Sequence, residues 1–178
     1  MDVIRNRSVV PDRWRLELAA ADDLVTAAIA PGDVLVSLPR WLRDHEQLLA
    51  RGTRVGVRLE PAGDLDALIG CELHELWLVE IPFASAAEGR GYSQARLLRS
   101  RHDFHGDIRA SGEVSRDRLA FMERCGFNEF ALPQGRDLHD ALRAFDEVEP
   151  RYQPGTDAGV LVAQQRGYRA HLGVPSAA

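Results

Sequence analysis

The sequence predicts an α/β fold in which repeated strand–helix units form a mostly parallel sheet covered by helices. Short apolar runs alternate with amphipathic segments along the chain, and five apolar runs begin at positions 34, 55, 76, 107 and 129, which lie 21 to 31 residues apart. This spacing fits strands joined by crossover helices. An open sheet is favoured because a complete eight-stranded barrel typically needs about 250 residues. A truncated TIM-like barrel is the second choice.

The expected strands are apolar runs rich in β-branched and aromatic residues. They cover residues 34–38, 55–59, 76–83, 107–111 and 129–132, and the first thirty residues, with Val9, Trp14, Leu16 and Leu18, are expected to add edge strands. Trp41 and Trp77 lie on apolar faces and are expected in the core.

The expected helices fill the intervals between these strands. Pro39 can open the first helix, whose apolar face is Trp41, Leu42, Leu48 and Leu49, and a short second helix covers 64–69. The remaining helices are expected at 94–101 with Ser93 as N-cap, from Ser115 as N-cap to Gly126, and at 136–148 with Leu138, Leu142 and Phe145 facing inward.

Length and composition indicate one ordinary globular domain. A chain of 178 residues buries roughly two-thirds of its unfolded surface, and 45% hydrophobic with 28% charged residues is typical of a folded protein. We expect a single domain over residues 1–153 and a partly mobile C-terminal tail over 154–178. Cys71 and Cys125 are expected to be free thiols.

The charge and hydropathy patterns exclude two classes of partner. No apolar run approaches the roughly 20 residues of a membrane helix, and the net charge of −5 disfavours nucleic acid, which requires a broad positive surface. The N-terminal residues lack the pattern of a secretory signal, so the expected location is the cytoplasm. All 22 basic residues are arginine, and residues 90–124 hold eight of them against five acids.

An anion site is one interpretation of the loop before the third helix. Gly89 and Gly91 would let the backbone approach a ligand, while Ser93 and the free N–H groups of the helix start would bind an oxyanion that Arg90 completes with two hydrogen bonds. The alternative is structural: the glycines turn the chain, Ser93 caps the helix and the arginines are solvated. Arg96 and Arg99, three residues apart, share one side of the helix.

Two charged residues, Arg109 and Glu80, interrupt apolar strands, and each has either a structural or a functional role. Arg109 is either paired with an acid such as Glu113, Asp117 or Glu80, or directed at a ligand. Glu80 is either a structural ion-pair partner or a general base.

Metal and cofactor motifs are weak. The spacings Cys71-x-x-His74 and His102-x-x-His105 each lack a second pair at standard distance, so no metal site is predicted. Gly89-x-Gly91 lacks the third glycine of a dinucleotide fingerprint, and the cofactor, if any, is unknown.

One ordered motif carries a resemblance. It reads Gly89-Arg90-Gly91-Tyr92-Ser93-x-Ala95-Arg96-x-Leu98-Arg99, then Gly106-x-Ile108-Arg109-Ala110-x-Gly112-x-Val114, Arg116-Asp117 and Arg124-x-Gly126-Phe127-x-x-Phe130. With this motif as its specific part, the chain from about Val34 to Gln153 is similar to a bacterial family of unknown function, members of which are often encoded beside assimilatory sulfite reductase and sometimes labelled probable oxidoreductases.

The resemblance implies a role in sulfur assimilation and brings no established catalytic residue. It supports the hypothesis that Arg90, Tyr92, Ser93, Arg96 and Arg109 form a functional cluster. The chain departs from the family pattern at Glu88, where aspartate is usual, at the soft run 84–87, and at Arg118, where glutamine is usual.

Three hypotheses about function follow. The first is an accessory or regulatory protein of sulfate and sulfite reduction that binds a small oxyanion, or a partner such as sulfite reductase, through the arginine-rich loop. The second is an enzyme acting on an anionic sulfur or phosphate metabolite, with Glu80 or Asp117 as base and Arg109 as charge stabiliser. The third is a structural subunit whose arginines hold the fold or a dimer interface. Oligomeric state is open.

Overall fold

The computed structural model describes residues 1–17, 31–85 and 88–147. Its centre is one eight-stranded sheet in the order β2-β1-β8-β7-β6-β5-β4-β3. The strands are β1 (Asp2–Arg5), β2 (Ser8–Pro11), β3 (Arg15–Glu17), β4 (Val34–Ser37), β5 (Val55–Arg58), β6 (Leu78–Phe83), β7 (Asp107–Gly112) and β8 (Glu129–Phe130).

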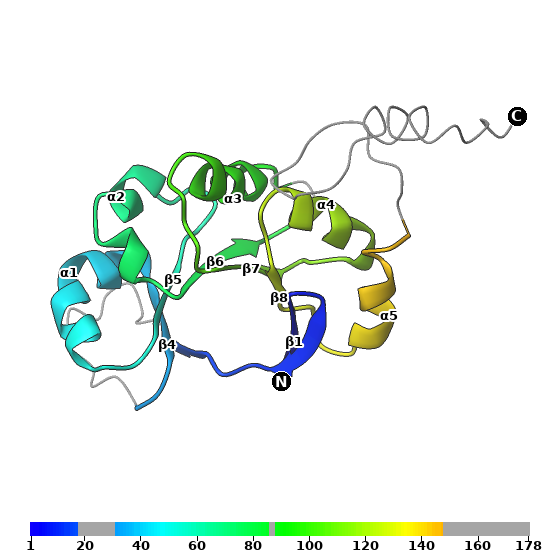
Figure 1. Cartoon of the computed structure of the whole chain (residues 1–178), viewed down its shortest axis with the longest axis horizontal. Helices are drawn as coiled ribbons and strands as arrows, with labels where there is room; N and C mark the ends of the chain where they lie inside the picture. The colour runs from blue at the N-terminus through cyan, green and yellow to red at the C-terminus, as the bar shows by residue number, and fades with distance from the viewer. Residues whose placement is uncertain (18–30, 86–87, 148–178) are drawn as a thin grey trace, which may run out of the picture.

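The sheet is parallel from β3 to β8, whereas β1 pairs antiparallel with both β8 and β2. The expectation of a mostly parallel sheet is therefore confirmed, and the antiparallel edge was not predicted. Each strand from β3 to β8 lies beside the next one in the chain. Crossover connections between neighbouring parallel strands have the same hand, so their helices lie on one face of the sheet. The sheet curls into an open half-barrel with the helices outside (Figure 1).

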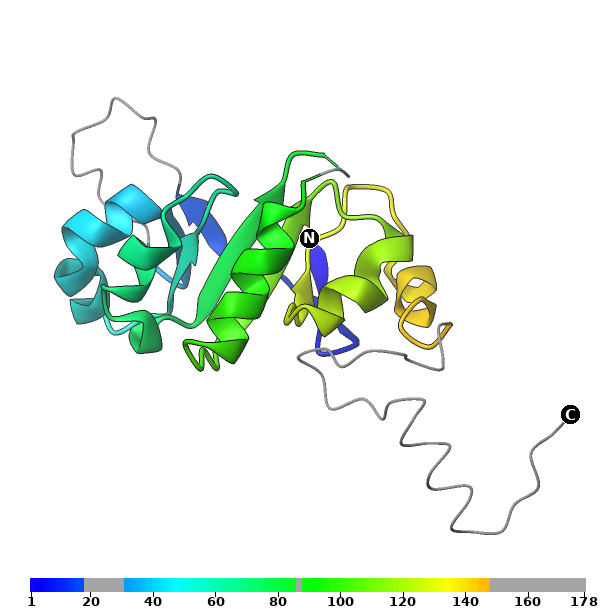
Figure 2. The same cartoon turned by 90° about the horizontal axis from the view of Figure 1, so that it is seen from above.

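In the described part of the chain, five helices cover the outer, convex face of this sheet (Figures 1 and 2). Helix α1 begins at Ser37, whose hydroxyl accepts from the Arg40 N–H, with Pro39 in its first turn; Asp64 and Asp137 cap α2 and α5 in the same way. The helices are α1 (Leu38–Ala50), α2 (Leu65–Ile69), α3 (Arg90–Ser100), α4 (Leu119–Arg124) and α5 (Leu138–Arg143), with 3-10 turns η1 (Leu73–Glu75) and η2 (Arg116–Arg118).

Two helix starts differ from the predictions. Helix α3 begins at Arg90 with Gly89 as N-cap, so Ser93 lies within its first turn and does not cap it. The predicted α4 start at Ser115 is a 3-10 turn that leads into the α-helix at Leu119. Gly126 follows the end of α4 with a φ of +112°, which a glycine adopts without strain, and this end was predicted.

The hydrophobic core fills the layer between the helices and the convex face. Trp41 and Leu48 of α1 are fully buried there, as expected, and the Trp41 indole N–H donates to the Cys71 carbonyl. Trp77 was expected in the core and is instead 52% exposed, because it precedes β6 at the rim of the sheet and stacks under the Arg54 guanidinium. Leu42, expected on the apolar face of α1, is 39% exposed.

The N-terminal segment contributes to both edges of the sheet. Strands β1 and β2 form a hairpin beside β8, and residues 12–14 then cross beneath the concave face to place β3 beside β4 at the other edge (Figure 1). The expected tail over 154–178 and the remainder of the first thirty residues lie outside the described residues. Within the described ranges, no helix has the length and apolar character to cross a membrane.

Candidate functional site

Four charged side chains form a row across the concave face of the sheet. Arg58, Glu80, Arg109 and Glu129 occupy paired positions on β5, β6, β7 and β8, so their charges alternate from strand to strand. Side chains alternate between the two faces of a strand, and Ile81 and Phe83 of β6 lie against α3 on the convex side. Glu80 and its neighbours in the row therefore face the concave side, away from α3.

Arg109 is the centre of this charge row. Its Nε donates to Glu129 Oε1 at 2.6 Å, its two terminal nitrogens bind both oxygens of Asp12 at 2.7 and 3.2 Å, and Nη1 lies 3.5 Å from Glu80 Oε2. Asp12 belongs to the segment that crosses the concave face. Arg109 thus joins three carboxylates from three parts of the chain.

Burial and pairing set the ionisation of the central pair. Burial alone lowers the pKa of the Arg109 guanidinium, but the bonds and charges of Asp12 and Glu129 outweigh it and leave that pKa raised. The same burial raises the pKa of Glu129, although the charge of Arg109 partly offsets the effect. Each charge depends on its partner, as expected for ions removed from water.

Glu80 and Arg109 belong to one network of ion pairs on the concave face. Glu80 accepts from Arg58 Nη1 at 2.9 Å through one oxygen and faces Arg109 through the other, so its carboxylate is engaged on both sides. Of the three acids expected beside Arg109, only Glu80 is a partner. Glu129 and Asp12 were missed, because they lie 20 and 97 residues away along the chain.

The predicted anion cluster is divided between two faces of the sheet. Arg90, Gly91, Tyr92, Ser93 and Arg96 lie on α3 outside the sheet, whereas Arg109 faces the concave side. Gly91 serves packing: a Cβ there would come within 2.8 Å of Phe83 and 2.9 Å of Ile81. Close contact of α3 with β6 therefore requires this glycine.

Tyr92 lies between α3 and α4. Its ring contacts Phe83 and Phe121 at centroid distances of 5.2 Å each, and its hydroxyl accepts from Arg118 at 3.3 Å. Phe121 itself is 53% exposed. An aromatic contact between the two helices therefore reaches the surface.

The outer side of α3 carries arginine and no acid. Arg90, Ser93 and Arg96 are exposed there, and Arg101 follows directly after the helix. None of these three guanidinium groups has an ion-pair partner among the described residues. We call Arg90, Arg96 and Arg101 the α3 arginine face.

Arg99 differs from these neighbours because it is inserted between loops. It donates to the carbonyls of Gly126, Phe104 and Gly106 and to Asn128 Oδ1, at 2.5 to 3.1 Å. Burial lowers the pKa of its guanidinium. Arg99 therefore tethers the loops at the amino ends of β7 and β8 and is unavailable to a ligand.

A cavity of about 410 Å³ opens at the carboxyl ends of β7 and β8. Its apolar lining is Val114, Leu132 and Ala141, all buried. The loops that follow Ser111 and Leu132 form its walls, at the edge of the sheet where parallel α/β folds place their ligand sites.

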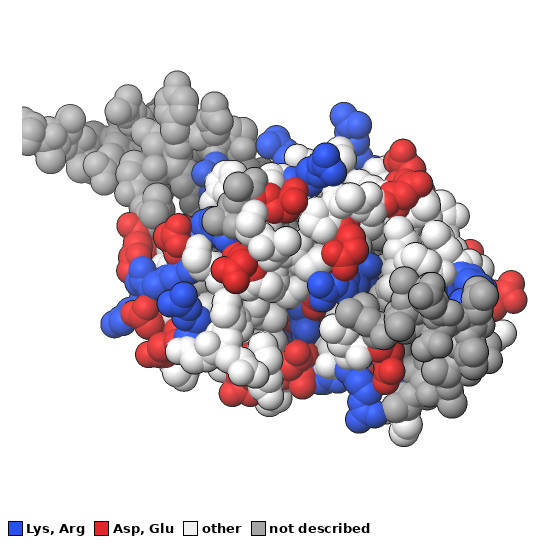
Figure 3. Space-filling model, turned by 180° about the vertical axis from the view of Figure 1, so that it is seen from behind, with Lys and Arg blue, Asp and Glu red and all other residues white. Residues whose placement is uncertain are grey.

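The rim of this cavity is charged with both signs. It contains Arg116, Asp117, Arg136, Asp137 and Asp140, with Ser115 beside them. The hydrogen bond from Ser115 lowers the pKa of Asp117, and that from Arg143, with the charge of Arg116, lowers the pKa of Asp140. Figure 3 shows that positive and negative side chains are also interspersed over the face of the molecule opposite to that of Figure 1.

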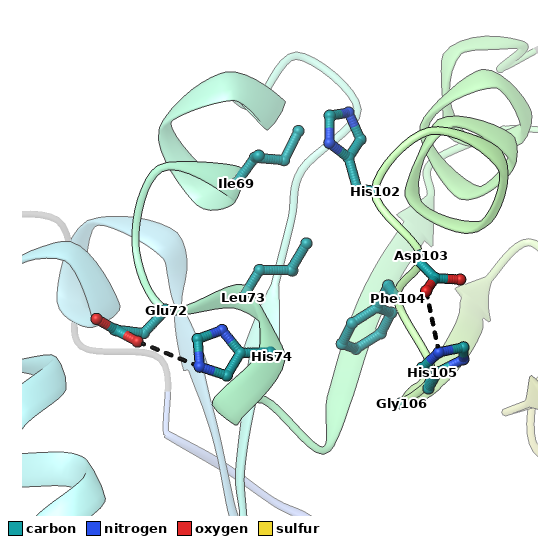
Figure 4. A pocket seen from close by; sticks show the side chains of 9 residues that line it. All are labelled: Ile69, Glu72, Leu73, His74, His102, Asp103, Phe104, His105 and Gly106. Carbon is teal, nitrogen blue, oxygen red and sulfur yellow. Dashed lines mark ion pairs between the residues drawn. The ribbon is translucent and has the colours of Figure 1, made fainter.

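A second cavity, of about 400 Å³, brings the two histidine motifs together (Figure 4). His74, His102 and His105 line it over a base of Leu73 and Phe104. His74 and His105 each face an acid of their own loop, Glu72 at 3.6 Å and Asp103 at 3.3 Å. In the described ranges, no three histidine, cysteine or acidic side chains are placed to hold a metal ion.

Comparison with protein families gives one match. A family model described as a bacterial protein of unknown function, DUF934, matches residues 56–161, which is more than half of the chain. The chain belongs to the DUF934 family. No curated protein matches it.

Most of the candidate site lies within the region that the DUF934 model matches. It contains α3, the charge row, both cavities and the motif from Gly89 to Phe130. Strands β1 to β4 precede it, and with them Asp12, the third carboxylate at Arg109.

Proposed function

We propose that this protein is an accessory component of sulfite reduction that docks on an acidic surface of the reducing enzyme through the α3 arginine face. The observation that carries the proposal is the charge of α3. The helix contains Arg90, Arg96 and Arg99 and no acidic residue, although the whole chain has a net charge of −5. A positive helix on an acidic protein favours steered contact with a negative partner.

The arrangement of the arginines favours a macromolecular partner over a small oxyanion. Arg90 and Arg101 are eleven positions apart, which on a helix corresponds to about 16 Å. They lie along the outer side of a helix on the convex face, and neither cavity includes them. A sulfate-sized ion could contact one of them at a time, whereas an extended acidic surface could contact all three.

An aromatic contact lies beside this face. Tyr92 and Phe121 form the contact between α3 and α4, and Phe121 is exposed at the surface. Arginine and large aromatic side chains are the residues most enriched at the energetic centres of protein interfaces. Phe121 supplies an apolar contact that arginines alone would lack.

The link to sulfite reduction rests on the resemblance carried by the motif from Gly89 to Phe130. In that motif, Gly91 and Arg99 support the fold, while Arg90 and Arg96 remain available to a partner. The proposal therefore assigns different roles to neighbouring residues of one motif, and these roles can be separated by mutation.

A binding experiment tests the proposal. Purified assimilatory sulfite reductase is immobilised, and binding of the full chain is measured at 50 and 300 mM NaCl. We expect saturable binding of the unmodified chain, with an affinity at least tenfold lower at 300 mM than at 50 mM NaCl. At 50 mM NaCl, the Arg90→Glu/Arg96→Glu double variant should bind at least tenfold more weakly than the unmodified chain.

The matched control is Arg15→Glu, an exposed arginine on edge strand β3 far along the sheet from α3. It should bind as the unmodified chain does. Absence of binding at low salt, or an equal loss of affinity in the control and the double variant, would overturn the proposal.

A further inference from the structure

We propose that the cavity at the carboxyl ends of β7 and β8 binds a small zwitterion, an α-amino acid with an uncharged side chain. This site is separate from the α3 arginine face, and the inference does not depend on the docking function. It rests on the position of the cavity, its apolar base, and two charged residues on its rim that form no ion pair with a described residue.

Position and size both suit a small ligand. The loops that follow parallel strands at their carboxyl ends hold the ligand sites of related α/β architectures. A volume of about 410 Å³ is within the range of small-molecule sites. The base, formed by Val114, Leu132 and Ala141, offers apolar contact to a ligand side chain.

Three of the rim charges are already engaged in holding the fold. Arg116 binds Glu147 with two nitrogens and Asp140 with Nε at 2.9 Å. Asp140 also accepts from Arg143, and Asp137 caps α5 by accepting from two backbone N–H groups. These bonds close the walls of the cavity and leave little capacity for a ligand.

Two charged residues of opposite sign on the rim, Arg136 and Asp117, take part in none of these ion pairs. Arg136 is exposed, and its guanidinium has no ion-pair partner among the residues the structure describes. Asp117 is exposed, its carboxylate accepts from the hydroxyl of Ser115 and lies near the charge of Arg118, and it forms no ion pair with any residue that the structure describes. The depressed pKa of Asp117 keeps it a carboxylate at neutral pH.

One positive and one negative group above an apolar base match the chemistry of an amino acid. The planar guanidinium of Arg136 can bind the ligand carboxylate with two hydrogen bonds, and the Asp117 carboxylate can accept from the ligand ammonium. The ligand side chain then lies on Val114 and Leu132. A simple anion would satisfy Arg136 and meet repulsion from Asp117 and Asp140.

Calorimetric titration of the full chain tests this inference. The probes are L-alanine, L-serine, L-cysteine and L-leucine, with propionate as the carboxylate-only analogue, ethylamine as the amine-only analogue, and sulfate as the simple anion. We expect at least one amino acid to bind saturably, and at least tenfold more tightly than propionate, ethylamine or sulfate.

Two variants assign the binding to this cavity. Arg136→Gln and Asp117→Asn should each weaken amino-acid binding at least tenfold. The matched controls Arg15→Gln and Asp103→Asn remove exposed charges elsewhere and should leave it unchanged. Thermal unfolding of each variant checks that the fold is intact.

Three outcomes would overturn the inference. They are no heat of binding with any of the four amino acids, binding of sulfate or propionate as tight as that of the best amino acid, and unchanged affinity in both cavity variants. Because the Arg90→Glu/Arg96→Glu variant leaves the cavity intact, its amino-acid binding should persist even where docking is lost. The two proposals can therefore fail separately.

Discussion

Arg109 and Glu129 occupy paired positions on the neighbouring parallel strands β7 and β8, and Arg109 Nε donates to Glu129 Oε1 at 2.6 Å. Both side chains are almost completely buried. A shift of β8 by one residue would turn Glu129 to the opposite face, where its charge has no partner, and would remove one of the three carboxylates of Arg109. The pair therefore fixes the register of a strand only two residues long.

Substitution of Arg109 should destabilise the protein more than substitution of Glu129. Arg109→Met leaves Glu129, Asp12 and one oxygen of Glu80 without their shared cation, at an expected cost of about 3–5 kcal/mol. Glu129→Gln leaves Arg109 with two carboxylates and should cost about 1–3 kcal/mol. Urea unfolding monitored by circular dichroism measures both, and the reverse order would contradict the central role of Arg109.

The glycine of α3 should be intolerant of a methyl group. Gly91→Ala places a Cβ against Phe83 and Ile81, and we expect a loss of about 1–3 kcal/mol despite the higher helix propensity of alanine. Gly89→Ala is the matched control, since a Cβ there meets no atom within 4 Å. Thermal unfolding of the two variants should separate them by several degrees, and equal melting temperatures would refute the packing role.

Two arginines of the same helix should differ in their effect on stability. Arg99→Met removes the donor to three carbonyls and Asn128, and we expect a loss of about 2–3 kcal/mol from the unsatisfied acceptors. Arg96→Met changes an exposed side chain and should leave the unfolding midpoint nearly unchanged. A comparable loss in both variants would argue against the tether.

Stability should fall at acid pH, in part through the cavity rim. The folded state lowers the pKa of Asp140 below its ordinary value of 3.8, so the unfolded chain binds protons more readily. The resulting stability is present above pH 3.8 and is lost as the pH falls through the folded-state pKa. Urea midpoints between pH 5 and 2.5 should decline less steeply in Asp140→Asn, and identical slopes would contradict this contribution.

Local sequence patterns were sufficient to predict most strands of the parallel sheet and several helix ends. Pro39, Asp64 and Gly126 mark helix ends through properties of the residue itself, and the apolar runs of β4 to β7 are recognisable within a few positions. The start of α3 was misplaced because Ser93, a good N-cap residue, lies inside a helix whose first turn is fixed by Gly91 packing on β6. Tertiary contact overrode local propensity there.

The charge row and the curl of the sheet depend on distant parts of the chain. Arg109 could be recognised as a buried charge, but Asp12 becomes its partner only because the N-terminal segment crosses the concave face. The cavity lies at the carboxyl ends of parallel strands, where α/β folds place their ligand sites, whereas Arg136 gave no signal, since a single arginine after a turn has no pattern of its own. Composition predicted the arginine excess without showing that Arg99 and Arg109 are structural.

The N-terminal hairpin and β3 occupy the two ends of the strand order. Without residues 1–17, the backbone donors and acceptors of β8 and β4 would be open to other chains, and a fragment cut to the family match at 56–161 would expose β8 and β5. Unpaired strand edges promote edge-to-edge association. The N-terminal segment, which lies outside the family match, therefore covers both edges of the parallel part of the sheet, and we expect a fragment of residues 56–161 to self-associate.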